Sequence, residues 1–94
     1  ALKDLDEVIK ILKNLGRPIT IQGHTDSLPP KKGSNWELST LRATYIVKYM
    51  IKKHGFPTTR LSSAGYADTK PIAHNGTNSG RQLNRRVEFQ VHYE

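Results

Sequence analysis

Cysteine is absent from the 94-residue sequence, which excludes disulfides and thiolate catalysis and leaves the redox compartment open. Long apolar runs are absent too: no segment approaches the ~20 residues that a membrane-spanning helix needs, and no signal-peptide pattern opens the chain. Aromatic residues make up only 7%, and they are not interleaved with basic residues as in RNA-binding signatures. The chain opens at Ala1 in a helical pattern without an initiator methionine, so we expect one domain, residues 1–94, cut from a longer protein.

Acidic residues are few relative to basic ones, so the net charge is +7 and the pI is about 9.9. An excess of lysine on a soluble surface explains this charge without any partner. The functional alternative is attraction to an anionic polymer, which includes nucleic acid, lipid headgroups and cell wall. Charge alone leaves these alternatives open.

The first third of the chain predicts a helix followed by a strand. Apolar residues recur at three- and four-residue steps over residues 2–15, which is typical of an amphipathic helix. Gly16 ends this helix and Pro18 prevents its return. Residues 19–22 then alternate apolar and polar side chains, which predicts a short strand with one buried face. The apolar positions of the helix are Leu2, Leu5, Val8, Ile9, Leu12 and Leu15.

A second helix follows a loop over residues 27–34. Ser34 and Glu37 have the spacing of a capping box, in which each side chain binds the other residue's free backbone amide. The helix is predicted to run to about His54 and to end at Gly55, with Pro57 beyond. Its apolar residues are Leu38, Tyr45, Ile46, Val47, Tyr49 and Met50.

The last third predicts two strands separated by a polar loop. Residues 61–66 favour a strand, residues 67–80 a loop, and residues 81–83 a helical turn. Alternation over residues 86–93 predicts the last strand, which should pair with the first in the middle of the sheet. Helices alternating with strands indicate an α/β two-layer sandwich with helices packed on one face of the sheet.

Two charged residues carry the predicted chemistry. Arg42 lies on the apolar side of its helix, where an unpaired charge costs several kcal/mol, so it needs a partner or a stem that reaches water. Asp26 follows a strand, where a carboxylate often only caps a turn. Both lie beside the same loop, and a ligand with an ammonium and a carboxylate on one carbon, such as an amino acid, could bridge them. Two or three charged hydrogen bonds would give an affinity on the order of micromolar to millimolar.

Three blocks of residues resemble the OmpA-like peptidoglycan-binding domain in order and spacing. They are Thr25-Asp26, then Asn35-x-x-Leu38-Ser39-x-x-Arg42-Ala43, then Gly80-Arg81-x-x-Asn84-Arg85-Arg86-Val87-Glu88. The resemblance spans nearly the whole chain and implies a mixed sheet. The family's first strand, which precedes the first helix, is missing here, so we expect a sheet that is incomplete or completed by another segment.

The resemblance implies a ligand and a set of roles. Asp26 and Arg42 would hold the amino and carboxylate groups of diaminopimelate in the peptidoglycan stem peptide, without catalysis, metal or cofactor. Arg85 would support the site or contact the wall. The residues implied to line or support the pocket are Thr25, Asn35, Leu38 and Ala43.

Within the family, residues 34–39 and the proline-bearing loop after Asp26 are most similar to the MotB-like stator branch. That similarity implies a periplasmic domain of an inner-membrane-anchored protein, a homodimer, and a MotA-like partner bound through an N-terminal membrane segment. The alternatives are an anchor of the OmpA or Pal type with the same ligand, a basic nucleic-acid-binding module, and a small wall hydrolase.

The remaining candidates have plain structural explanations. His24 lies near Asp26, but no metal-site spacing surrounds it, so we expect a hydrogen-bonded strand-end or surface histidine. Trp36 either packs under the loop or stacks on a sugar ring. The basic cluster Arg81, Arg85 and Arg86 either pairs with residues such as Glu88 or contacts anionic groups. Neither Ser27 nor Ser39 has a nucleophile-elbow pattern.

Overall fold

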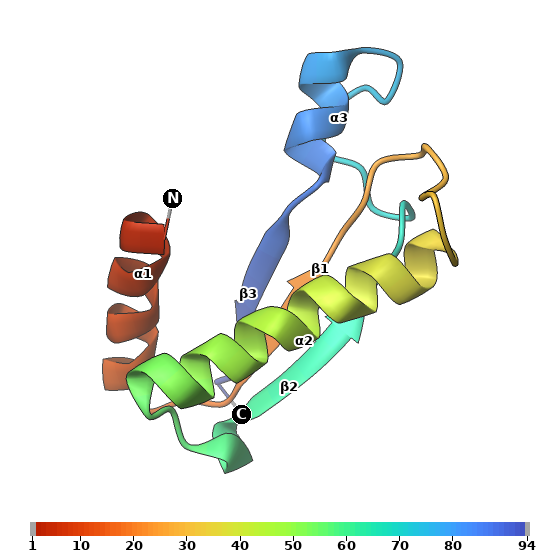
Figure 1. Cartoon of the computed structure of the whole chain (residues 1–94). Helices are drawn as coiled ribbons and strands as arrows, with labels where there is room; N and C mark the ends of the chain where they lie inside the picture. Colours follow the sequence, from red (N-terminus) through yellow and green to blue (C-terminus); the bar gives the residue numbers. More distant parts are fainter. Residues whose placement is uncertain (1, 94) are drawn as a thin grey trace.

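A three-stranded mixed sheet forms one layer of the protein, and helices on one of its faces form the other (Figure 1). The computed structural model describes residues 2–93. The central strand β1 pairs parallel with β2 and antiparallel with β3, giving the order β2-β1-β3. In chain order the elements are α1 (Leu2–Leu15), β1 (Ile19–Gly23), α2 (Asn35–His54), the 3-10 helix η1 (Thr58–Arg60), β2 (Leu61–Gly65), α3 (Asn78–Asn84) and β3 (Val87–Val91).

The core lies between the sheet and the two longer helices. α1 contributes Ile9 and Leu12, and β1 contributes Ile19 and Ile21. Met50 of α2 is fully buried against them. The opposite face of the sheet is polar: Thr20 bonds the Ser62 hydroxyl and His92 Nε2, both at 2.7 Å, and Gln22 donates to Gln90 at 2.8 Å. One buried and one polar face give the predicted two-layer sandwich.

Two paired glycines let α2 approach the sheet closely. Gly23 and Gly65 lie opposite each other in the β1–β2 register. A Cβ added at Gly23 would lie 2.0 Å from the Ser39 carbonyl oxygen, and one at Gly65 would lie 2.2 Å from Thr40 Oγ1. The first two turns of α2 therefore pack directly on the ends of both strands. This packing fixes α2 relative to the loop that follows β1.

The ends of α2 follow the predicted signals. Ser34 and Glu37 form the capping box, and Gly55 adopts a left-handed conformation with φ 60° as the C-cap. The end of α2 also holds α1 in place, because the Asp6 carboxylate accepts hydrogen bonds from Tyr49 (2.6 Å) and His54 (2.7 Å). These two hydrogen bonds lower the pKa of Asp6.

Several sequence predictions differ from the structure. Helix α3 starts at Asn78, inside the predicted loop, because Thr77 caps it through the Gly80 amide. β3 is shorter than predicted and lies at an edge of the three-strand sheet, with β1 in the middle. Val8 and Leu15 are 41% and 45% exposed, so the buried stripe of α1 is narrower than its apolar pattern. None of the helices within residues 2–93 combines the length and the apolar character needed to cross a membrane.

Candidate functional site

The chain stays buried after β1 ends, at the edge of the sheet where the predicted site lies. His24, Thr25 and Asp26 are only 1%, 3% and 6% exposed. The His24 amide donates to the Arg86 carbonyl and the Thr25 amide to the Ala67 carbonyl, both at 2.9 Å. These bonds continue the pairing of β1 with its two neighbours. Asp26 is therefore held on a rigid extension of the sheet.

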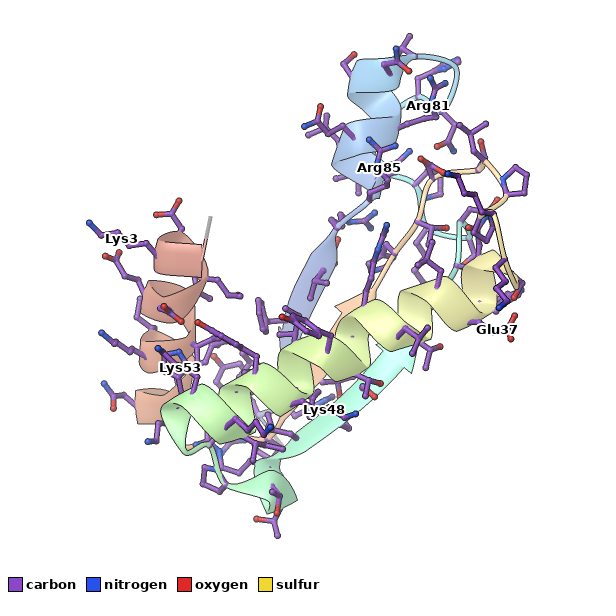
Figure 2. All side chains as sticks on the ribbon, viewed as in Figure 1. Lys3, Glu37, Lys48, Lys53, Arg81 and Arg85 are labelled. Carbon is purple, nitrogen blue, oxygen red and sulfur yellow. The ribbon has the colours of Figure 1, made fainter. Side chains whose placement is uncertain are left out.

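The Asp26 carboxylate has two partners. Oδ1 accepts the Leu28 amide at 3.0 Å, which is the predicted turn cap. Oδ2 accepts Nη1 of Arg85 at 2.6 Å. The Asp26 side chain is 9% exposed and the Arg85 side chain 41% exposed, so the ion pair is open to solvent on the arginine side. Figure 2 shows Arg85 at the base of α3, next to the loop that follows β1.

Arg42 is half-buried beside the same segment. Its Nη1 donates one long hydrogen bond, 3.4 Å, to the carbonyl of His24, two residues before Asp26. It forms no ion pair with any carboxylate of residues 2–93, so the internal salt bridge considered from its helix position is not formed there. The guanidinium thus keeps unused donors, since five N–H groups are available.

The structure places the other predicted pocket residues in two groups. Thr25 and Asn35 support the Asp26 segment: the Thr25 hydroxyl and Asn35 Nδ2 both donate to the Asp26 carbonyl, at 2.9 and 3.3 Å. Leu38 is half-buried, and Ala43 is fully buried in the core. Ala43 therefore acts through packing, because it has no exposed surface for a ligand.

A shallow apolar groove of about 470 Å³ lies next to Arg42. Its walls come from α2 and from Val87, at the start of β3. Leu41 and Tyr45 at this groove are 67% and 68% exposed, although Tyr45 is one of the apolar residues named for this helix. The side of α2 that carries Arg42 is therefore accessible, and the groove could receive the aliphatic part of a ligand.

His24 differs from its prediction. Its ring is buried and stacked on Tyr66, with centroids 5.4 Å apart, and neither ring nitrogen has a hydrogen-bond partner within residues 2–93. The expectation of a hydrogen-bonded histidine is therefore wrong. Burial lowers the pKa of the His24 imidazole, and the nearby Arg86 charge lowers it further. No group of three metal-ligating side chains occurs in the described part of the chain.

The three arginines of the predicted basic cluster have separate roles. Arg81 donates to the Asn75 carbonyl at 2.9 Å. Arg86 pairs with Glu88 and donates to the Lys70 carbonyl at 2.9 Å. The hydrogen bond from Arg86 lowers the pKa of Glu88. Arg81 and Arg86 therefore brace the loops, and Arg85 is the member of the cluster that reaches Asp26.

Three residues support the site in ways that sequence reasoning missed. The Asn84 side chain is fully buried and makes four hydrogen bonds: three with the backbone of Ile72 and Ala73, and one that its Nδ2 donates to the Asn75 side chain. Ser39 accepts the amide of Ala67 at 3.0 Å. Ala67 has a left-handed φ of 53°, which costs a non-glycine residue about 1 kcal/mol or more. Ser39 and Asn84 both belong to the motifs that resemble the OmpA-like family. That membership was the sequence signal that could have identified their supporting roles.

The fold and site together define a class: a small α/β domain with fixed opposite charges at one end of its sheet. A family model described as "OmpA family" matches residues 1–85, and the chain belongs to this family. Motility protein B of Bacillus subtilis is 39% identical over 92 residues, which are 95% of this chain and 34% of that protein. The chain spans about a third of the length of such curated relatives.

Two solved structures share the fold closely. The C-terminal domain of Helicobacter pylori MotB is 32% identical with a TM-score of 0.84, and the match covers 94% of this chain and 68% of that one. The cell wall anchor of the type VI secretion system from Pseudomonas aeruginosa is 31% identical with a TM-score of 0.88, covering 99% of this chain and 66% of that one. These matches confirm the predicted OmpA-like fold and the similarity to MotB.

Proposed function

We propose that this domain binds peptidoglycan by holding the free amino-acid end of diaminopimelate in an uncrosslinked stem peptide. One observation carries the proposal: Asp26 is a buried carboxylate on a rigid strand extension, and the Arg42 guanidinium, which keeps unused donors, binds the backbone carbonyl two residues before it. The two groups come from different elements that close glycine packing locks together. A zwitterionic group satisfies both charges at once, whereas a simple cation or anion satisfies one.

The ligand would bind by exchange of partners. Its ammonium takes the place of the Arg85 guanidinium on Asp26 Oδ2, and its carboxylate takes the unused N–H groups of Arg42. Arg85 can leave because its side chain is 41% exposed and regains water. Each charged hydrogen bond contributes about 1.5–3 kcal/mol, less the cost of breaking the existing pair. An affinity on the order of micromolar to millimolar follows, which suffices for a polymer with many copies of the ligand.

For the parent protein, the similarity to MotB supports a role as a wall anchor of a flagellar stator. In that role the domain is periplasmic, the parent is held in the inner membrane, and its partners are a second copy and a MotA-like subunit. The domain acts by binding and carries out no catalytic step. An anchor of the OmpA or Pal type, with the same ligand and a different parent, is the alternative.

Cosedimentation with purified sacculi tests the proposal. Asp26→Ala and Arg42→Ala each remove one charge of the site, and either should reduce the sedimented fraction strongly at constant ionic strength. A double variant that remains folded and still binds sacculi as the wild type does would remove the proposed site.

Charge-matched controls separate the site from general attraction. Arg17→Ala also lowers the net charge by one, but Arg17 lies at the opposite end of the sheet, where it donates to the His92 carbonyl. Asp4→Ala raises the charge as Asp26→Ala does, on an exposed part of α1. Both controls should sediment like the wild type. If binding instead tracks net charge alone, the +7 charge and not the site explains it.

A further inference from the structure

Trp36 is the single tryptophan of the chain, and it is 56% exposed in the first turn of α2. It does not pack under the preceding loop, which was one of its two sequence interpretations. Its side chain instead forms one wall of a groove of about 450 Å³, whose other walls are Glu37, Thr40 and Leu41. A large aromatic ring exposed at this level needs an explanation, because tryptophan has a strong tendency to be covered.

The backbone around this groove is rigid. The Trp36 carbonyl accepts the hydroxyls of Ser39 (3.0 Å) and Thr40 (2.8 Å), and the capping box fixes the turn that contains it. Figure 2 shows Glu37 at this first turn of α2. A ring held on a rigid turn loses little conformational entropy when a ligand stacks on it.

The groups beside the ring suit a sugar. Glu37 Oε1 accepts the Ser34 amide at 2.8 Å, while Oε2 accepts no hydrogen bond from residues 2–93. A pyranose has a C–H face that packs on an aromatic ring and hydroxyls at its rim that donate to a carboxylate. An aromatic face next to a free carboxylate oxygen offers both contacts.

The position of Trp36 connects this groove to the proposed amino-acid site. Its chain neighbour Asn35 binds the Asp26 carbonyl at 3.3 Å and the Leu28 carbonyl at 3.2 Å, so the two sites share one loop. Diaminopimelate is the third residue of a stem peptide that is covalently attached to a sugar. Three extended residues span about 10 Å, so a stem held at Asp26 keeps its sugar within reach of the next turn.

We propose that Trp36 and its groove form a subsite for the N-acetylated sugar that carries the stem peptide. This inference rests on the proposed function and deepens it: the domain binds both the sugar and the stem peptide attached to it, and not the peptide alone. The sugar adds one stacking contact, which corresponds to about threefold to tenfold in affinity.

Two ligands test the subsite: the free tripeptide L-Ala-D-Glu-meso-diaminopimelate, and the same tripeptide on its N-acetylglucosamine–N-acetylmuramic acid disaccharide. The wild type should bind the disaccharide form about threefold to tenfold more tightly. Trp36→Ala should remove this gain and leave tripeptide affinity unchanged, while Trp36→Phe should keep part of it. Tyr93→Ala is the matched control, since Tyr93 is an exposed aromatic residue, at 70%, beyond the opposite end of the sheet.

The fluorescence of the single tryptophan gives a direct second readout. The disaccharide ligand should shift the Trp36 emission, and the tripeptide should not. Equal affinity of the wild type for both ligands, or an equal loss of both in Trp36→Ala, would overturn the sugar subsite and leave the proposed function intact. Failure of the wild type to bind either ligand would remove both. Binding of only the disaccharide form, lost in Trp36→Ala, would keep the subsite and remove the amino-acid site.

Discussion

Two arginines at opposite ends of the sheet have opposite environments. Arg60, beside the C-terminus of α1, uses its whole guanidinium on the main chain and stacks over Phe56 at 4.4 Å. Its three nitrogens donate to the carbonyls of Arg17 (2.9 Å), Lys13 (3.1 Å) and Leu12 (3.0 Å). Arg42, at the other end, makes one hydrogen bond of 3.4 Å.

The difference teaches which charges serve the fold and which are available to a ligand. Arg60 donates hydrogen bonds to carbonyls left open by a helix end and complements the helix dipole. Its donors therefore stabilise the folded protein and are not available to a ligand. Arg42 keeps donors free on the segment that carries Asp26, whose own partner Arg85 has a side chain that is 41% exposed. Arg60 therefore serves stability, and under the proposed function Arg42 serves binding.

The largest expected effect comes from removing the structural arginine. Arg60→Ala should lower the free energy of unfolding by about 2–3 kcal/mol, because it leaves helix-end carbonyls without their charged donor. Urea unfolding measures this loss. Sacculus binding by the remaining folded protein should not change. Arg60→Lys keeps the charge but not the planar fork, and should recover only part of the stability. A wild-type unfolding curve for Arg60→Ala would contradict the assignment.

Arg42→Gln should show the reverse pattern. Binding of the diaminopimelate tripeptide should weaken by at least tenfold, about 1.5–3 kcal/mol, because a charged hydrogen-bond donor is lost. Stability should stay within about 0.5 kcal/mol, since Arg42 makes one long hydrogen bond. Calorimetric titration and urea unfolding on the same preparation give both numbers. A larger loss of stability than of affinity would show that Arg42, like Arg60, has a structural role and not a binding role.

We expect His24 to make the Asp26 end of the sheet sensitive to acid. Burial lowers its pKa in the folded protein, so the folded state resists protonation that the unfolded chain accepts below about pH 6.5. Stability should be full above that pH and should fall as the pH drops through 6.5 toward the lowered pKa. The facing charges are Arg86 and Lys70, which oppose protonation, and Glu88, which favours it.

Urea unfolding at pH 7.5 and pH 5.5 tests this behaviour. His24→Leu should reduce the pH dependence, because it removes the titrating ring from the buried position. An unchanged slope in His24→Leu would show that other groups cause the acid sensitivity.

The smallest effect concerns the partner that occupies Asp26. If ligand ammonium and Arg85 compete for the carboxylate, Arg85→Gln should raise the affinity for free diaminopimelate by up to about fivefold, because a part-exposed ion pair is worth at most about 1 kcal/mol. Amide shifts of Asp26 in a titration measure the affinity. A loss of affinity in Arg85→Gln would instead make Arg85 a ligand contact, as the resemblance allows.

Local sequence patterns predicted the ends of helices and strands well where interactions within a few residues determine those ends. The capping box at Ser34 and the left-handed Gly55 set the ends of α2 through contacts within a few residues. The exposure of Val8 and Tyr45 was not predictable, because it depends on how far a three-strand sheet extends under each helix. Sequence periodicity identifies the apolar face of a helix, but it does not give the area of the sheet that can cover that face.

The sequence placed the proposed site residues near one another, but it did not reveal their pairings. Asp26 and Arg42 were placed at one loop by position along the chain, and the structure puts Arg42 against the segment that carries Asp26. The pairing of Asp26 with Arg85, 59 positions further on, depends on the long-range placement of α3. The positive φ of Ala67 left no signal, since alanine rarely adopts it and tertiary hydrogen bonds hold it there.

The most direct test compares two tripeptides that differ by one carboxylate: L-Ala-D-Glu-meso-diaminopimelate and L-Ala-D-Glu-L-lysine, titrated calorimetrically into the wild type and Arg42→Gln. Both ligands offer Asp26 the same ammonium, and only the first offers Arg42 a carboxylate. We expect the wild type to prefer diaminopimelate by at least about tenfold and Arg42→Gln to bind both equally. Equal binding by the wild type, or a preference that survives in Arg42→Gln, would contradict a site built from these two charges.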